Sequence, residues 1–305
     1  MKYFLLVFSL LFSIVINAEP LYWQAKKGNQ TLLIVGSIHV GDESMYPLPQ
    51  AVTQFFESSD GLVVETDVRK IEGITYPPTQ HLSKDVLNTQ QLSQLVTVAK
   101  QLGLNAENLK DSPPWVTALQ LQQAQWSLLG YVPSDGVDMR LMYKATINNK
   151  PIFSLEELQF QIDLLANQPE DGKEFLTSIL DEWDNSEQVL HCLIESWTAG
   201  DQHKLIQFAE LEQMSEEMVD AFITQRNNAW ADKLSSDYFL PNKDGNYLVV
   251  VGTLHLVGKH NLLDLLTTKG FAVKQLSTSQ TVSCDFEYTI PTPQIRQSPA
   301  LLRGL

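Results

Sequence analysis

The chain has 305 residues, 44% of them hydrophobic, and a formal net charge of −15 at pH 7. A chain of this length and apolar content can bury a substantial core, as one large domain or two small ones. Its acidic balance makes it a poor non-specific partner for nucleic acid or anionic lipid, and its scattered aromatic residues lack interleaved basic ones. We therefore expect no nucleic-acid partner.

The N-terminus reads MKYFLLVFSLLFSIVINAEP. Lys2 supplies a positive charge, residues 5–16 form an apolar core, and Ala18 is a small residue at a plausible cleavage site. This pattern predicts a secretory signal peptide over residues 1–18, since the apolar run is short for a membrane span; a retained anchor is the alternative. No later stretch is long and apolar enough to span a membrane, so we expect a periplasmic or secreted mature chain, residues 19–305.

The first part of the mature chain predicts a hairpin followed by a strand–helix–strand unit. "LYWQAKKGNQTLLIVGSIHVG" holds two strand-like runs around a Lys-Lys-Gly-Asn turn at residues 26–29. A short helix follows over residues 51–58, and "GLVVETDV" (residues 61–68) is a buried strand with Glu65 near its carboxyl end. This succession is typical of α/β proteins.

Helical spacings dominate the middle of the chain, about residues 82–237. "LNTQQLSQLVTVAKQLGL" and "WVTALQLQQAQWSLLG" are amphipathic helices separated by two prolines. A helix over residues 138–146, a short strand over 151–155 and an acid-rich helical region over 170–237 follow.

Strand-like sequence returns at the end of the chain, with strands at residues 247–253 and 272–276 around a helix at 258–269. The sequence therefore predicts an α/β fold. Its central mixed sheet is formed by the N- and C-terminal segments, with a long helical insertion between them. We expect one domain over residues 19–305.

The same pattern occurs in two of these strands. "LLIVGSIHVG" (residues 32–41) and "VVVGTLHLVG" (residues 249–258) both run apolar residues, Gly, a hydroxyl residue, an apolar residue and His. Open α/β sheets bind ligands at the carboxyl ends of their strands. The repeat therefore predicts one site shared by His39 and His255, with two merely packed histidines as the alternative.

The other residues of the repeat support such a site. Gly36 and Gly252 lack a Cβ, so another backbone or a ligand can approach closely. Ser37 and Thr253 can hydrogen-bond the neighbouring loop.

Glu65 follows the apolar run "LVV", where an acid is costly to bury unless it is paired or binds a cation. Two imidazoles and a carboxylate are a common ligand set for zinc, iron or manganese. The alternative is an ion pair, for which Arg226 in "QRNNAWADKL" is a candidate partner.

Other polar residues have structural explanations. Asp138 is expected to cap the helix that follows it, and Glu156 and Glu157 to begin another. In an exported chain a disulfide between Cys192 and Cys284 is as well supported as two buried free thiols.

The chain resembles the TraB/PrgY/GumN family, which includes the Tiki proteases, on these motifs in order: "IVGSIHVG", "LVVETD", "GVDMRLMYKATINNKPIFSLEELQFQIDLL", "RNNAWADKL" and "YLVVVGTLHLVGKHNLLDLLTTKGFAVKQL". The resemblance covers nearly the whole mature chain and is strongest for the bacterial GumN branch, whose members carry a signal peptide. It implies a metal-dependent hydrolase fold related to erythromycin esterase and the ChaN haem-binding proteins.

The resemblance also implies roles for particular residues. The two Gly-x-x-His motifs end at His39 and His255, the strand-end acid is Glu65, and the Arg-Asn pair is Arg226 and Asn227. Tiki-type members are described as peptidases that use manganese or cobalt. By resemblance, both histidines and Glu65 would hold or activate a metal-bound water, while the Arg-Asn pair would stabilise the oxyanion.

The sequence thus favours a secreted or periplasmic metal-dependent hydrolase that acts on a peptide or protein. The alternative is a non-catalytic binding protein for a peptide signal, haem or a metal ion, as in pheromone-inhibiting and haem-binding relatives. A scaffold with two packed histidines is the third hypothesis.

Overall fold

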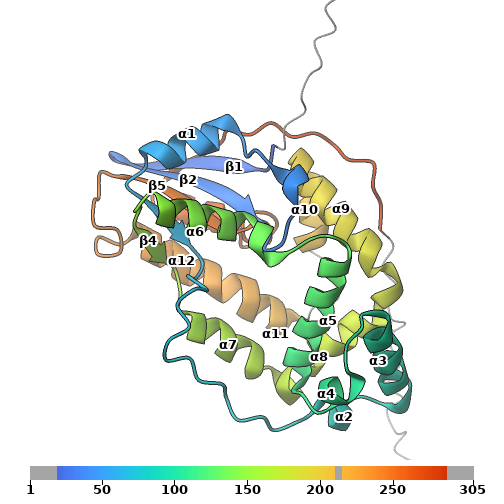
Figure 1. The fold of residues 1–305 in the computed structure, drawn as a ribbon. Coiled ribbons are helices and arrows are strands. Elements are labelled where there is room, and N and C mark those ends of the chain that lie inside the picture. The colour runs from blue at the N-terminus through green and yellow to red at the C-terminus, as the bar shows by residue number, and fades with distance from the viewer. Residues whose placement is uncertain (1–18, 210–214, 287–305) are drawn as a thin grey trace, which may run out of the picture.

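The computed structural model describes residues 19–209 and 215–286, which form a six-stranded sheet flanked by helices, with a helical lobe to one side (Figure 1). The signal peptide expected over residues 1–18 lies outside the described residues. Among the residues that are described, no helix is long and apolar enough to cross a membrane.

The sheet has the strand order β4-β3-β5-β2-β1-β6. Its four parallel strands are β2 (Gln30–Ser37), β3 (Gly61–Val64), β4 (Ile152–Ser154) and β5 (Asn246–Gly252). Strand β1 (Tyr22–Lys27) lies between β2 and the edge strand β6 (Ala272–Gln275) and is antiparallel to both. The central strands are continuous apolar runs because helices cover both of their faces.

The two ends of the chain meet in the middle of this sheet. β2 and β5 are parallel neighbours, and their register pairs Gly36 with Val251 and Ser37 with Gly252. The two His motifs therefore leave the sheet side by side at the carboxyl ends of their strands. The predicted fold class, a mixed sheet built from both chain ends around a helical insertion, is confirmed.

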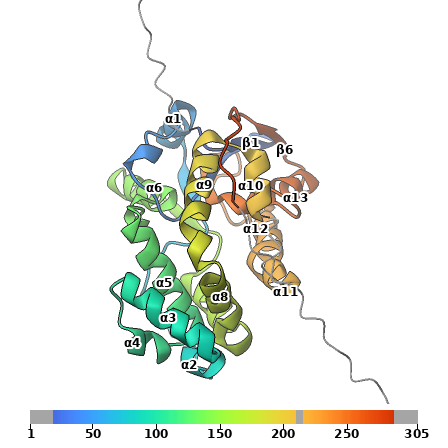
Figure 2. The same cartoon turned by 90° about the vertical axis from the view of Figure 1, so that its right-hand side faces the viewer.

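Helices lie on both faces of the sheet and share its main core. Figure 2 shows α1 and α6 on one side and α12 and α13 on the other. Their bounds are α1 (Gln50–Ser58), α6 (Val137–Ile147), α12 (Gln225–Ser235) and α13 (Leu262–Thr268). Buried side chains from these helices and from the strands form one continuous cluster, which holds the strand ends rigidly in place.

The helical lobe has a smaller core of its own. That core includes Leu95, Leu121, Leu176 and Leu180. The lobe and its connections comprise α2 (Ser83–Val86), α3 (Thr89–Gln101), α4 (Ala106–Lys110), α5 (Pro114–Leu128), α7 (Leu158–Ala166) and α8 (Pro169–Asp181). The chain returns to the sheet through α9 (Ser186–Ala199), α10 (Gln202–Ala209) and α11 (Glu216–Val219).

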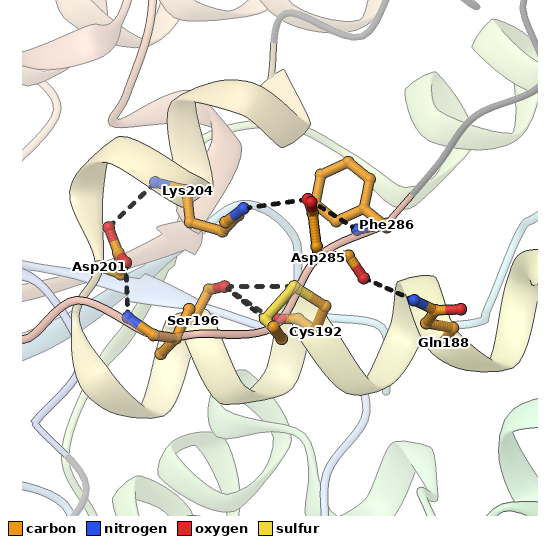
Figure 3. Close-up of a disulfide and its surroundings, with 9 residues drawn as sticks. Gln188, Cys192, Ser196, Asp201, Lys204, Asp285 and Phe286 are labelled. Atoms are coloured by element: carbon orange, nitrogen blue, oxygen red, sulfur yellow. Dashed lines mark hydrogen bonds and ion pairs between the residues drawn. A yellow bond between two sulfur atoms is a disulfide. The ribbon is translucent and has the colours of Figure 1, made fainter.

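A disulfide joins Cys192 on α9 to Cys284 in the segment after β6 (Figure 3). Asp201 accepts a hydrogen bond from the backbone N–H of Val282 at 2.9 Å. The Gln188 carboxamide donates to the Asp285 carbonyl at 2.6 Å. These contacts hold the C-terminal segment along α9.

We expect the double variant Cys192→Ala/Cys284→Ala to lose about 2–4 kcal/mol of unfolding free energy, because the bond restricts the unfolded chain. The cysteines are 92 residues apart, so the closed loop is long. Urea unfolding without reductant measures the difference. Reduction of the wild type should reproduce it, and an unchanged midpoint in both experiments would contradict the prediction.

Candidate functional site

The site lies where β2, β3 and β5 end. His39 follows β2 by two residues, Glu65 follows β3 directly, and His255 ends the short helical turn Thr253–His255 after β5. Arg226 and Asn227 reach the same place from α12. Parallel strands release their chains at one edge of the sheet, so residues far apart in sequence meet here.

His39 lines a pocket and is held by Asp138. Its Nδ1 lies 3.0 Å from Asp138 Oδ2, and within the described residues Nε2 has no hydrogen-bond partner. The side chain is 60% accessible to solvent. Burial lowers the pKa of His39, but the charge and hydrogen bond of Asp138, with help from Glu65, outweigh it and raise the pKa to about 9. His39 therefore carries a positive charge at neutral pH.

The role expected for Asp138 was wrong. The N-cap of α6 is Gly136, without a side-chain cap, and Asp138 lies in the first helical turn. Its carboxylate turns to His39 instead, because the chain after β2 passes this helix start: the Val137 N–H donates to the Ile38 carbonyl at 3.1 Å. The Gly-Val-Asp sequence alone did not show that the helix start lies against the first His motif.

Glu65 is buried and ionised. Its Oε2 accepts from Arg226 Nη2 at 2.5 Å, and its Oε1 accepts from the Gly252 backbone N–H at 2.6 Å. Burial raises the pKa of this carboxyl, but His255, His39 and Arg226, together with the Gly252 N–H, lower it to about 2. Arg226 is the permanent charge among these partners, so Glu65 is a carboxylate throughout the physiological range.

Every N–H of the Arg226 guanidinium is engaged within the protein. The acceptors are Glu65, both oxygens of Glu156, the Phe222 carbonyl and Nε2 of His255, at 2.5 to 3.2 Å. Phe222 lies in the π-helical turn Asp220–Thr224 that precedes α12, a distortion frequent at functional sites. A guanidinium has five donors, so none is left for a substrate oxyanion. The geometry therefore favours a positioning role for Arg226.

Glu156 is a site residue that sequence reasoning did not find. Rather than beginning a helix, it precedes α7, whose N-cap is Glu157. Its carboxylate pairs with Arg226 at 2.7 Å and also accepts from Trp230 Nε1 at 3.0 Å. The available signal was weak, an acid soon after a short strand.

His255 is held as a neutral ring. Its Nδ1 lies 2.8 Å from the Asn227 side-chain oxygen, while the Asn227 nitrogen donates to the His260 carbonyl at 2.9 Å. This pattern assigns the proton to Nδ1, so that Nε2 accepts from Arg226 at 3.1 Å. Burial lowers the pKa of His255, and the outcome, against the opposing charge of Glu65, is about 4.

The glycine of each His motif lies in close contact with side chains from neighbouring strand ends. A Cβ on Gly252 would be 3.2 Å from Glu65 Oε1 and 3.8 Å from His39 Nε2, so those two groups face this backbone. A Cβ on Gly36 would be 2.5 Å from Thr253 Oγ1 and 3.0 Å from its Cβ. The first residue of each motif is therefore a contact surface for the other strand end.

We expect Gly36→Ala to lower the unfolding free energy by roughly 1–3 kcal/mol, because the added methyl overpacks the contact between the end of β2 and the turn that follows β5. The atoms it meets belong to Thr253, so Gly36→Ala/Thr253→Gly should cost less than the sum of the two single changes. Urea unfolding of the four chains measures this coupling. Strict additivity would show that the strain is elsewhere.

The pocket above His39 has a volume of about 320 Å³. Its polar lining is formed by Ser37, His39, Glu65, Asp138 and other residues, whereas His255 and Arg226 lie outside that lining. The Ser37 hydroxyl is buried and has no hydrogen-bond partner within the described residues. The structure thus separates the predicted residues into a group that faces the pocket and a supporting group behind it.

The donors do not converge as a metal centre in this arrangement. Within residues 19–209 and 215–286, no group of three His, Cys, Asp or Glu side chains is placed to hold a metal ion. The guanidinium of Arg226 lies between Glu65 and His255 and uses a lone pair of each. A cation at this point would have to displace it. The ion-pair alternative for Glu65 is the one that the geometry shows.

The protein is an α/β protein with a Gly-x-x-His motif at the ends of two adjacent parallel strands. Comparison with known proteins identifies its family. Residues 21–275 match the TraB/PrgY/gumN family model, and the chain belongs to this family. It is 31% identical over 241 residues to the uncharacterized protein YbaP of Escherichia coli, covering 78% of this chain and 89% of YbaP; Shigella flexneri YbaP matches equally. An uncharacterized Treponema pallidum protein is 21% identical over 164 residues, half of this chain and 48% of its own length. No solved structure matches the chain.

Proposed function

We propose that this chain is a hydrolase that cleaves peptide bonds in the pocket above His39. One observation carries the proposal: a solvent-accessible, positively charged imidazole is fixed by Asp138 beside an ionised carboxylate, Glu65. Environments that push the pKa values of two adjacent groups apart are typical of acid–base sites.

The pocket residues have distinct chemical tasks in this proposal. Each oxygen of Glu65 accepts one hydrogen bond from the protein and keeps a lone pair, with which it can orient an attacking water and take up the proton that this water loses as its oxygen bonds to the carbonyl carbon. The proton on His39 Nε2 would pass to the leaving amine nitrogen, and its charge would stabilise the tetrahedral intermediate. Release of the Glu65 proton to solvent and uptake of one by His39 restore both groups for the next turnover. Arg226 and His255 would hold Glu65 in place.

The test is incubation of the mature chain, residues 19–305, with a pool of synthetic peptides, followed by mass spectrometry of the products. The reaction is run with a chelator and separately with added manganese, cobalt, zinc or iron. New peptide ends that accumulate over many turnovers would support the proposal. Absence of cleavage under every condition would refute it and favour the binding-protein alternative, in which a peptide is retained without being cut.

The divalent metal that the family resemblance implies has no part in the mechanism proposed here, and its binding is tested separately. We expect well under one metal ion per chain after dialysis against these metals, because Arg226 donates hydrogen bonds to Glu65 Oε2 and His255 Nε2, the atoms that would bind the metal. Elemental mass spectrometry measures the content, with the His39→Ala/His255→Ala double variant as control. About one ion per wild-type chain, lost in the double variant, would overturn this expectation and show that Arg226 moves aside.

The location of the chain is part of the proposal. The apolar N-terminus supports export, and a disulfide between Cys192 and Cys284 is the kind of bond that persists in an oxidising compartment. We propose that the mature chain acts in the periplasm or outside the cell.

A further inference from the structure

A second hollow adjoins the pocket of His39. It is a groove of about 510 Å³ between α5 and α7, with the exposed ring of Tyr76 at its rim. Gln161 on α7 lines both the groove and the pocket, so the two hollows are one side chain apart. The Gln161 carboxamide donates to Glu156 at 2.8 Å, and Glu156 in turn pairs with Arg226. The wall between groove and pocket is therefore fixed to the site network.

The groove is uncharged in a strongly acidic protein. None of its ten lining residues is charged, although the whole chain has a net charge of −15. Leu119 contributes a side chain that is 42% exposed, and Leu158, Ile162 and Leu165 are only partly buried. Contiguous exposed apolar surface of this kind commonly marks a binding groove.

The chain that follows Glu65 builds the remaining wall. It passes beside α7 on its way to α2 (Figure 1), and Gln159 fixes it by accepting from the Thr75 N–H at 2.8 Å and donating to the Thr75 carbonyl at 2.7 Å. Tyr76 then stacks against Trp115 of α5, with ring centroids 6.4 Å apart. The aromatic rim is thus positioned by the segment that leaves the active-site carboxylate.

We propose that this groove is the substrate subsite for a bulky apolar side chain of an extended peptide whose cleaved bond lies in the pocket of His39. The inference rests on the proposed function and narrows its substrate class. Continuity through Gln161 is the reason for choosing a segment of the same substrate as the occupant. Successive side chains of an extended peptide point to opposite sides, so one residue can enter the pocket while another reaches the groove.

Binding is measured separately from cleavage. The protein is the mature chain carrying His39→Asn, so that any cleavage of the probe is slow compared with the binding measurement. The probe is a rhodamine-labelled amidated hexapeptide, Gly-Ser-Phe-Leu-Ser-Gly, and its partner has serine in place of Phe-Leu. Fluorescence anisotropy gives the dissociation constants. We expect the apolar probe to bind at least about tenfold more tightly than the serine probe, the size typical of one apolar pocket contact.

Leu119→Glu introduces a charge into the groove and should remove that tenfold preference. Leu128→Glu is the matched control, because Leu128 lies on the same helix, is 71% exposed and does not line the groove. Equal binding of both probes, or an unchanged preference in Leu119→Glu, would overturn the inference. So would concentration-dependent dimerisation that Leu119→Glu abolishes while the probe fails to bind, since a second copy would then be the occupant.

The two proposals fail in distinguishable ways. Leu119-dependent binding of the apolar probe without cleavage by the wild type would refute hydrolysis and leave the groove assigned. Cleavage with no preference for an apolar residue at any position, unchanged in Leu119→Glu, would refute the assignment of the groove as a subsite. The proposal that the chain is a hydrolase would still stand.

Discussion

His39→Asn is expected to slow peptide cleavage by about 10²- to 10⁴-fold, the range lost when a positioned acid or base is removed. Asparagine can keep a hydrogen bond to Asp138 but cannot deliver a proton to the leaving amine. The unfolding free energy should change by no more than about 1 kcal/mol, because solvent screens the ion pair of this 60% exposed side chain and asparagine keeps the hydrogen bond to Asp138. Product formation under multiple-turnover conditions and urea unfolding measure the two quantities.

His203→Asn is the matched control, the same substitution at an exposed histidine of α10 that does not line the pocket. It should leave cleavage unchanged. Comparable rates for the His39→Asn and wild-type chains would remove His39 from the reaction and with it the proposed mechanism.

Asp138→Asn separates positioning from charge. The variant keeps a hydrogen-bond acceptor for His39 but loses the charge that raises the imidazole pKa to about 9. A reaction that needs protonated His39 fades as pH rises through that pKa. We therefore expect the alkaline fall in rate to move to lower pH in the variant. A merely structural role for Asp138 would lower the rate without moving the profile.

Arg226→Met is expected to lower the unfolding free energy by about 3–5 kcal/mol at pH 7, because it leaves two nearly buried carboxylates without their cation. The Glu65 and Glu156 side chains are each only 8% exposed and both pair with this guanidinium. Methionine preserves much of the volume, so the lost charge accounts for most of the effect. Urea unfolding followed by circular dichroism measures it.

The cost of Arg226→Met should depend on pH. The pKa of Glu65 in the wild type is lowered from 4.5 to about 2, so this group stabilises the fold above pH 4.5 and the benefit is lost as pH falls toward 2. Without Arg226 the carboxyl can protonate in the folded chain at mildly acidic pH, and the deficit should shrink below pH 4.5.

Arg140→Met is the control for that variant. Arg140 pairs with Asp135, and each side chain is about a third exposed, so the change should cost no more than about 1 kcal/mol at any pH. A deficit for Arg226→Met as small as that of Arg140→Met would show that the buried ion pairs do not hold the site together.

The sequence by itself determined the fold class and predicted which strand ends hold the candidate site. Continuous apolar runs predict buried parallel strands, and the repeated Gly-x-x-His pattern at two strand ends predicts that His39 and His255 meet. β2 and β5 are indeed parallel neighbours in register. These features are local in sequence, because a short window of the chain indicates whether a strand is buried and where it ends.

Only the tertiary structure decided what each site residue contacts. Asp138 holds His39, Glu156 completes the ion pairs of Arg226, and Arg226 occupies the space between Glu65 and His255. These partners come from α6, the segment before α7 and α12, which lie 29 to 161 positions away from the groups they bind. Local patterns set propensities for a cap or a helix start. A charge is buried only when distant elements pack together. The free-energy cost of leaving it unpaired then favours the packing in which it has a partner.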